Sequence, residues 1–351
     1  RCALSVATAL HNRGMTIGLT GALAVGLAAA LDWLIGDPRW MLHPVQVMGW
    51  LIQRLHRLVE AWSRESPLKL RLGGVLITLL LIGGSGLTGW WIERLALVDS
   101  DFAGLGWLLV LLGLASALAG RSLYNSVLAV IDALPIGPSG DLNPAQEKLS
   151  WIVGRDVRQL DGSGIVRAAA ESASENAVDG LFAPLFWMGV GSWLWTVDPG
   201  WPGPLALAWM FKASSTLDSM LGYREGSLRW LGTAGARADD LLTWLPCRLV
   251  MLSLPLVSCS WNRWSRLVRD AESDGRMDPS PNAGRSEAIY AHCIGISLGG
   301  RNRYNRQWRQ KPVLASLCPA PDGSAVKRIL KATLKLELLW LSGLVVLQLA
   351  Q

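Results

Sequence analysis

The sequence predicts an all-α, polytopic integral membrane protein with about four to six membrane-spanning helices. Hydrophobic residues make up 51% of the 351 positions and charged residues only 17%, with a mean hydropathy of +0.30. Tryptophan occurs 19 times, against 4 Phe and 4 Tyr, which suits a protein with long water–lipid boundaries. The length alone would allow two soluble domains, but this composition indicates a membrane protein.

The net charge and the cysteines exclude several other classes of protein. The charge of +6 is spread over the segments between apolar runs, which is typical of positive-inside bias and not of a nucleic-acid-binding domain. The five cysteines are odd in number, widely scattered and without a CxxC pair, so they predict neither a disulfide framework nor a zinc site. We expect Met15 to open the natural chain and residues 1–14 to lie upstream of it.

The apolar runs give the expected spans. The first three cover residues 17–35, 72–92 and 105–119. Residues 181–211 are apolar but interrupted by Pro and Gly, so they predict either a hairpin or a span followed by a half-helix. Residues 241–257 predict a weak span, a re-entrant segment or an in-plane helix, and residues 336–350 a short final helix.

Charge asymmetry predicts the orientation of these spans. Residues 53–71 are basic and residues 93–101 are net acidic, which puts the first loop in the cytoplasm and the second outside. We therefore expect one membrane domain over residues 15–351. Its expected cytoplasmic segments are residues 36–71, 121–180, 212–240 and 261–335.

An acidic helix is expected directly before the fourth apolar run. Ser163 is a candidate N-cap, residues 165–179 favour a helix, and Gly180 is a candidate stop.

On that helix three carboxylates share one face. Glu171, Glu175 and Asp179 are spaced i, i+4 and i+8, and like charges at this spacing repel by a few tenths of a kcal/mol per pair. A solvated acidic face is one interpretation. Because the helix leads directly into a segment that is apolar enough to span a membrane, we favour a divalent cation that offsets the repulsion.

Common nucleotide and metal fingerprints are missing or misplaced. Residues 84–89 match G-x-G-x-x-G but lie inside an apolar span, where small residues favour helix packing. No Lys follows a Gly, so there is no P-loop, and the four histidines are too scattered for an H-E-x-x-H metalloprotease.

Ionisable residues gather at the predicted membrane–cytoplasm junctions. Such groups are costly there unless paired or solvated, so each is either a juxtamembrane salt bridge or part of a site. Carboxylates bind Mg²⁺, and Arg and Lys bind phosphates, so the mixture indicates a phosphoryl-handling site. The clusters are Asp32, Asp37 and His43; Arg155 and Asp156; Glu171, Glu175, Asn176 and Asp179; Lys212 and Asp218; Arg237, Asp239 and Asp240; and Asn282, Arg285 and Glu287.

Several of these clusters sit in longer motifs that resemble one known family. The motifs are LDWLIGDPRW with His43-Pro44, GRD at 154–156, the run from Glu171 to Phe186, KASSTLDSMLGYR at 212–224, ARADDLLTWLP at 236–246, SPNAGRSE at 280–287 and LGG at 298–300. In this order they are similar to the CobD/CbiB family, the adenosylcobinamide-phosphate synthases of cobalamin biosynthesis. Ser215 replaces an Asn of the family pattern, which puts a hydrogen-bonding role at that position in doubt, and Thr233 stands where Trp or Tyr is frequent.

The resemblance implies a multi-pass enzyme of the bacterial inner membrane whose site faces the cytoplasm. It implies that ATP and Mg²⁺ are used to join a carboxylate of adenosylcobyric acid to the amine of (R)-1-aminopropan-2-ol phosphate. Phosphorylation would turn a carboxylate oxygen into a leaving group, which needs metal, cations and a base. The partners implied are the corrinoid, the amino-alcohol phosphate and the lipid bilayer, with no nucleic acid, and with a homo-oligomer left open.

By analogy with the family, roles are assigned to the residues of these motifs. Catalytic, acid–base or amine-binding roles fall to Asp37, His43, Asp156, Glu175 and Lys212. Substrate or phosphate binding falls to Arg155, Asn176, Lys212, Arg224, Arg237, Asn282, Arg285 and Glu287. Metal binding falls to Glu171, Glu175, Asp179, Asp218, Asp239 and Asp240.

The segment 280–287 is expected to be a shaped loop. Pro281 restricts the preceding residue and Gly284 permits a tight turn, so backbone N–H groups and the fork of Arg285 could face a phosphate. Glu287 would hold the guanidinium or accept the substrate ammonium.

Two other classes of function remain open. One is a non-catalytic membrane sensor or scaffold of the AmpE type, and the other is a transporter. A scaffold has no need of the carboxylate stripe, and a transporter should carry its polar residues at mid-membrane. The clustering of these residues at one predicted face favours the enzyme.

Overall fold

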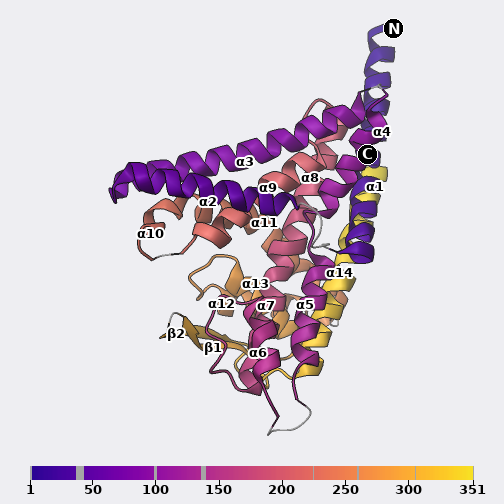
Figure 1. Cartoon of the computed structure of the whole chain (residues 1–351). Coiled ribbons are helices and arrows are strands. Elements are labelled where there is room, and N and C mark those ends of the chain that lie inside the picture. The colour runs from indigo at the N-terminus through magenta and orange to yellow at the C-terminus, as the bar shows by residue number, and fades with distance from the viewer. Residues whose placement is uncertain are drawn as a thin grey trace. The chain divides into compact units, whose positions relative to one another are not determined.

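The computed structural model describes residues 2–36, 43–98, 101–135, 140–223, 225–258, 261–304 and 306–350 (Figure 1). These ranges hold five helical segments that are long and apolar enough to cross a membrane. The segments are Gly18–Ile35, Pro67–Leu97, Ala103–Asp132, Gly162–Val197 and Thr233–Ser258. The expected polytopic helical membrane protein is thereby confirmed.

The chain forms two compact units that each collect distant parts of the sequence. The first unit contains Arg1–Ala119, Ala183–Leu242 and Trp340–Gln351. The second contains Gly120–Phe182 and Thr243–Leu339.

The first unit is built from helices. They are α1 (Cys2–Ile35), α2 (Pro44–Ser63), α3 (Pro67–Leu97), α4 (Ala103–Ala115), α8 (Ala183–Val197), α9 (Pro204–Leu221), α10 (Leu228–Leu231) and the first part of α11 (Thr233–Ser258). Helix α3 packs along α9, and α8 packs on α1 and α9. A Cβ at Gly86 would lie 2.4 Å from Met210 Cγ, and one at Gly89 would lie 2.8 Å from Ala206 Cα. Gly86 and Gly89 of the G-x-G-x-x-G sequence therefore permit close helix packing, as expected, whereas Gly84 has no neighbour within 4 Å.

A buried carboxylate caps the start of α9 in the first unit. Glu93 is fully buried, and it accepts hydrogen bonds from the backbone N–H groups of Gly203 (2.8 Å), Leu205 (2.7 Å) and Ala206 (3.1 Å). An N-terminal turn of a helix leaves these donors without partners and carries a positive end charge. Glu93 of α3 thus satisfies the N-terminus of the helix that carries Lys212 and Asp218.

The second unit combines helices with a β-hairpin. Its helices are α5 (Gly120–Asp132), α6 (Asn143–Ser150), α7 (Gly162–Ala177), α12 (Trp264–Gly275), α13 (Ala283–Ile294) and most of α14 (Gly323–Leu349), with the short turns η1 (Val178–Phe182) and η2 (Trp261–Arg263) and the end of α11. Strands β1 (Leu298–Tyr304) and β2 (Gln307–Leu314) pair antiparallel, with Leu298 opposite Leu314 and Asn302 opposite Arg309. The hairpin, which the all-helical expectation did not include, packs against α7, α12 and α13 (Figure 1).

The acidic helix has different ends from those expected. Asp161, and not Ser163, is the N-cap: its carboxylate accepts from the backbone N–H of Gly164 at 2.8 Å, and the Ser163 hydroxyl donates to the same carboxylate. Helix α7 does not stop at Gly180 but runs through the π turn η1 into α8. Gly180 lacks the positive φ of a helix-ending glycine, and continuing the helix buries Leu181 and Phe182 completely.

The π turn also changes the acidic stripe. Asp179 lies in η1, beyond the last residue of α7, whereas Glu171 and Glu175 lie in α7 itself. A π turn has a wider hydrogen-bonding pattern than an α-helix, so Asp179 does not continue the α-helical i, i+4, i+8 row.

Four other segments are decided or corrected by the structure. The 181–211 region is a helical hairpin of α8 and α9, and Lys212 lies inside α9. Helix α11 continues through Pro246 and Pro255 as one helix. Helix α14 begins at Gly323, so the final helix is not short. The expected loop at 280–287 is wrong from residue 283 onward, because α13 begins at Ala283.

The reason for that last error is the packing of α12 on α13. A Cβ at Gly284 would lie 2.6 Å from the Gly275 carbonyl oxygen, and a Cβ at Gly275 would lie 2.6 Å from Arg285 Cα. The glycine that indicated a tight turn instead lets two helix backbones approach closely.

Candidate functional site

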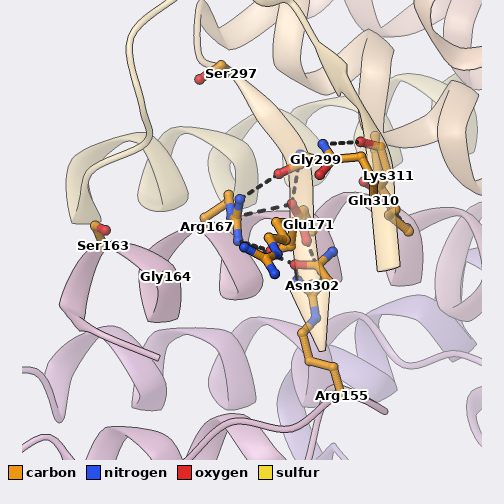
Figure 2. A network of polar contacts seen from close by, with 12 residues as sticks. Arg155, Ser163, Gly164, Arg167, Glu171, Ser297, Gly299, Asn302, Gln310 and Lys311 are labelled. Atoms are coloured by element: carbon orange, nitrogen blue, oxygen red, sulfur yellow. Dashed lines mark hydrogen bonds and ion pairs between the residues drawn. The ribbon is translucent and has the colours of Figure 1, made fainter. Parts of the chain in front are cut away.

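The centre of the candidate site is Glu171, a fully buried carboxylate on α7 that holds the β-hairpin (Figure 2). Its Oε1 accepts the backbone N–H of Gly299 at 2.8 Å, and its Oε2 accepts from Arg155 Nη2. Arg167, one turn before Glu171, has its Nε 3.9 Å from Oε1. Two guanidinium groups and one peptide N–H therefore converge on a single carboxylate.

The hairpin supplies hydrogen-bond acceptors to the same two arginines. Arg167 Nη1 donates to the carbonyl of Gly299 (2.7 Å), and Nη2 donates to the carbonyl of Arg301 (3.0 Å). The side-chain Oδ1 of Asn302 accepts from Arg155 Nη1 at 2.7 Å and from Arg167 Nη2 at 3.3 Å. Figure 2 shows these side chains meeting between α7 and the first strand of the hairpin.

Two glycines make this junction sterically feasible. Gly299 and Gly300 have φ values of +82° and +88°, and the strand register shifts between them. A Cβ at Gly299 would lie 1.9 Å from the Pro312 carbonyl oxygen. The bulge therefore requires glycine, and it turns the Gly299 N–H toward Glu171.

Charge and burial oppose each other at Arg155, whose side chain is 7% exposed. Burial acts to lower the pKa of its guanidinium, but the Glu171 carboxylate outweighs burial and the pKa is raised. Arg155 therefore stays charged, and its pairing with Glu171 compensates for its desolvation.

A second buried pair lies on the other strand. Lys311 Nζ donates to Glu287 Oε1 at 3.0 Å and lies 3.8 Å from Asp278 Oδ2. Burial raises the pKa of the Glu287 carboxyl to about 8, because Lys311 only partly offsets it and the charges of Glu171 and Glu175 add to it. Burial acts to lower the pKa of Lys311, but Glu287, Glu175 and Asp278 raise it above its usual range. Lys311 is the permanent cation of the pair, and Glu287 is the group able to exchange a proton near neutral pH.

The 280–287 segment is held by two arginines. Arg285 donates from Nε and Nη2 to Glu272 at 2.8 Å and 2.6 Å, a bidentate pair that raises the pKa of Arg285. Of the two roles expected for Glu287, holding the Arg285 guanidinium is wrong, because Arg285 pairs with Glu272 and Glu287 pairs with Lys311. Arg248 Nη1 donates to the side-chain oxygen of the buried Asn282 at 2.6 Å.

Two further motif residues, Asp156 and Asn176, make hydrogen bonds within the second unit. Asp156 Oδ2 accepts the backbone N–H of Arg306 at 2.9 Å, and Asp156 N–H donates to the Arg303 carbonyl at 2.9 Å, so this aspartate holds the hairpin's end. Asn176 donates to the Ser172 hydroxyl at 2.9 Å.

The remaining motif residues with described positions belong to the first unit. Asp239 on α11 interacts electrostatically with Asp218 and Lys212 of α9 and with the adjacent Asp240. Asp239 Oδ1 is buried and has no hydrogen-bond partner among the described residues. His43 is the N-cap of α2 and accepts the Val45 N–H at 3.3 Å. Arg237 is exposed, and Asp37 and Arg224 lie outside the described residues.

Glu171 in the second unit and the aspartates near Lys212 in the first unit differ in how well they suit a metal ion. Within the described ranges no three His, Cys, Asp or Glu side chains are set as ready-made metal ligands. Both oxygens of Glu171 already accept hydrogen bonds from Arg155 and Gly299. The aspartates near Lys212 include an unpartnered buried oxygen, and carboxylate oxygens are the donors that Mg²⁺ prefers. The aspartates of the first unit are therefore the better fit.

Several residues of the candidate site were not found by sequence reasoning. These are Arg167, Asn302 and Lys311 around the hairpin, and Glu272 as the partner of Arg285; Gly299 was part of a motif but had no expected role. One signal was present: Arg301 and Arg303 alternate with Asn302, and Tyr304 and Trp308 follow, a period of two that favours a strand. The Gly299–Gly300 pair before it indicates a bulge.

The fold and the site define a polytopic helical membrane protein in which Glu171, with Arg155 and Arg167, binds a β-hairpin. Residues 25–333 match the model of the CobD/Cbib protein family. The chain is 41% identical to the cobalamin biosynthesis protein CobD of Synechocystis, in an alignment that covers 84% of this chain and 82% of the relative. It is 40% identical to CobD of Klebsiella pneumoniae (83% and 86% covered) and 37% identical to the cobalamin biosynthesis protein CbiB of Salmonella typhimurium (83% and 86% covered). The chain belongs to the CobD/CbiB family. No solved structure matches it.

Proposed function

We propose that this protein acts in cobalamin biosynthesis as an ATP-dependent amide ligase of the cytoplasmic membrane. It joins a carboxylate of adenosylcobyric acid to the amine of (R)-1-aminopropan-2-ol phosphate and yields adenosylcobinamide phosphate. The family match over residues 25–333, with relatives named as cobalamin biosynthesis proteins, is the observation that carries the pathway. The particular reaction is the one that the family resemblance implies.

The chemistry of the described residues is compatible with this reaction. A carboxylate reacts with an amine only after one oxygen becomes a leaving group, and transfer of a phosphoryl group from ATP achieves this. The carboxylate oxygen attacks the terminal phosphorus, the nucleotide leaves, and the amine then displaces phosphate from the acyl carbon and loses a proton. Guanidinium groups such as Arg155 and Arg167 suit the binding of phosphate oxygens.

Magnesium would fit the aspartates of the first unit. Asp239, with Asp218 or Asp240 as a second carboxylate, would hold it, and Lys212, which acts electrostatically on Asp239, would bind a phosphate. Mg²⁺ is commonly bound by one or two carboxylates together with substrate phosphates, which agrees with the lack of a complete ligand set in the described ranges. When bound, the ion would neutralise charge on the transferred phosphoryl group.

Glu287 is the described group best suited to accept the proton of the incoming ammonium. Its pKa of about 8 lies close to neutral pH, where a general base is most effective. Lys311, which stays protonated, would keep Glu287 oriented.

The proposal is tested by incubating purified protein in detergent with ATP, Mg²⁺, the corrinoid acid and the amino-alcohol phosphate. We expect an amidated corrinoid by mass spectrometry, and a shift to higher Mg²⁺ requirement in Asp239→Asn. Asp101→Asn, which changes an exposed aspartate of the same unit, is the matched control. No amide product under conditions in which an active relative turns over would reject the ligase and favour a non-catalytic sensor or a transporter.

A further inference from the structure

The side-chain amide of Asn302 is oriented by two arginines of the candidate site. It is 1% exposed, and its Oδ1 accepts from Arg155 at 2.7 Å and from Arg167 at 3.3 Å. A guanidinium can only donate, so the oxygen of the amide must face the two arginines and the nitrogen must face away. The orientation of this amide therefore follows from its neighbours.

The nitrogen of this amide has no hydrogen-bond partner among the residues that the structure describes. Asn302 Nδ2 is buried, and it carries two N–H groups. Arg167 Nε is a second buried nitrogen without a hydrogen bond, its nearest carboxylate oxygen being 3.9 Å away. Buried polar groups in folded proteins nearly always have partners, so unsatisfied donors on two side chains that hydrogen-bond to each other indicate an acceptor that the described residues do not supply.

The charge around these donors selects the kind of acceptor. Arg155 and Arg167 carry two positive charges against the single charge of Glu171, so these three groups have a net charge of +1. Glu287, which also acts on Arg155, is paired with Lys311. The Arg167 side chain is 25% exposed, so this cationic edge reaches solvent. An acceptor that offers several oxygens and a negative charge satisfies both the N–H groups and the surplus charge.

We propose that Asn302, together with Arg167 and Arg155, is a ligand for a phosphoryl oxyanion, with the Asn302 amide N–H groups donating to its oxygens. This inference rests on the proposed function for the source of the phosphate, which is either the nucleotide or the phosphorylated amino alcohol. It extends that function by placing an anion ligand on the β-hairpin. The Gly299–Gly300 bulge and the clamp of Glu171 on Gly299 hold the strand that presents this amide.

The test is Asn302→Asp, which has the same shape but exchanges the amide donor for a charged acceptor. An aspartate keeps an oxygen for Arg155 and Arg167, so a purely structural Asn302 predicts a folded variant with unchanged ligand binding. The proposal predicts a folded variant that binds inorganic pyrophosphate at least about tenfold more weakly, because a donor to a charged oxygen is lost and a like charge is added. Gln310→Glu, which adds the same charge at an exposed position of the hairpin, is the control and should bind pyrophosphate like the parent.

Binding is measured by calorimetry on the full chain in detergent, with limited proteolysis to check the hairpin. A non-hydrolysable ATP analogue and the amino-alcohol phosphate, each alone, are then titrated, and the probe whose affinity falls in Asn302→Asp identifies the source of the phosphate. If Asn302→Asp loses the hairpin, Asn302→Ser replaces it, because a hydroxyl still accepts from Arg155 but offers no amide. Equal affinity in the parent and the substituted protein would overturn the proposal. Absence of binding of all three probes to the parent would also overturn it, since solvent alone would then satisfy the amide.

These binding measurements need no turnover. A protein that makes no amide product but binds pyrophosphate through Asn302 would refute the ligase function and leave this inference standing. A ligase whose phosphate affinities do not depend on residue 302 would support the proposed function and overturn this inference.

Discussion

The clearest consequence of the structure is that Glu171 should be the main determinant of hairpin stability. In Glu171→Ala, Arg155 keeps a side chain that is only 7% exposed but loses its carboxylate, and the Gly299 N–H loses its acceptor. Removing one partner of a buried ion pair costs about 3–5 kcal/mol. The orphaned N–H adds about 1–3 kcal/mol where water does not replace the lost bond. We therefore expect a loss of at least about 3 kcal/mol, concentrated in residues 298–314.

The assay compares the parent and the variant in the same detergent. Hydrogen exchange of the hairpin amides should speed up by about 100-fold or more, since 1.4 kcal/mol corresponds to a factor of ten. Glu147→Ala removes an exposed carboxylate of α6 in the same unit and should stay within about 0.5 kcal/mol of the parent. If hairpin exchange in Glu171→Ala matches that of Glu147→Ala, the idea that this carboxylate fastens the hairpin is wrong.

Three other substitutions test separate parts of the structure. Glu93→Gln leaves one acceptor oxygen for the three N–H groups at the start of α9, so it should lower the free energy of unfolding by about 1–3 kcal/mol. The loss should appear as a lower thermal midpoint, and an unchanged midpoint would contradict this capping role. Glu287 has a pKa of about 8 in place of 4.5, so the folded state binds more protons between these values, and its contribution to stability is present at low pH and is lost as pH rises through 8. Glu287→Gln should flatten the fall in thermal midpoint across that window, and a slope equal to the parent's would refute the assignment. Gly284→Ala should cost about 1–3 kcal/mol because its Cβ would lie 2.3 Å from Asp278 Cβ, whereas Gly83→Ala, with nothing within 4 Å, should be neutral or stabilising; equal effects would show that α12 and α13 can separate freely.

The helical spans could be predicted because their cause is local. A bilayer demands runs of about 20 apolar residues with internally satisfied backbones, and such runs are visible in the sequence without knowledge of any neighbour. For α11 the sequence left a weak span, a re-entrant segment and an in-plane helix open, and the structure shows one helix, Thr233–Ser258, that contains Pro246 and Pro255.

The motif residues were also visible in the sequence, but their partners were not. Glu171, Arg155 and Arg285 stood out as ionisable groups beside apolar runs. Their contacts are with Gly299, Asn302 and Glu272, and the first two of these contacts join residues 128 and 147 positions apart. Pairing at such separations depends on where whole elements pack, which no local pattern encodes.

Hydropathy and motif spacing are properties of short segments, so the class of protein, most of the spans and the family could be predicted before any fold was known. The contact of Glu171 with the hairpin, the pairing of Glu287 with Lys311 and the orientation of the Asn302 amide by two arginines became known only from the fold. Each of these depends on burial, which changes the cost of a charge and the choice of its partner, and burial exists only once the chain has folded.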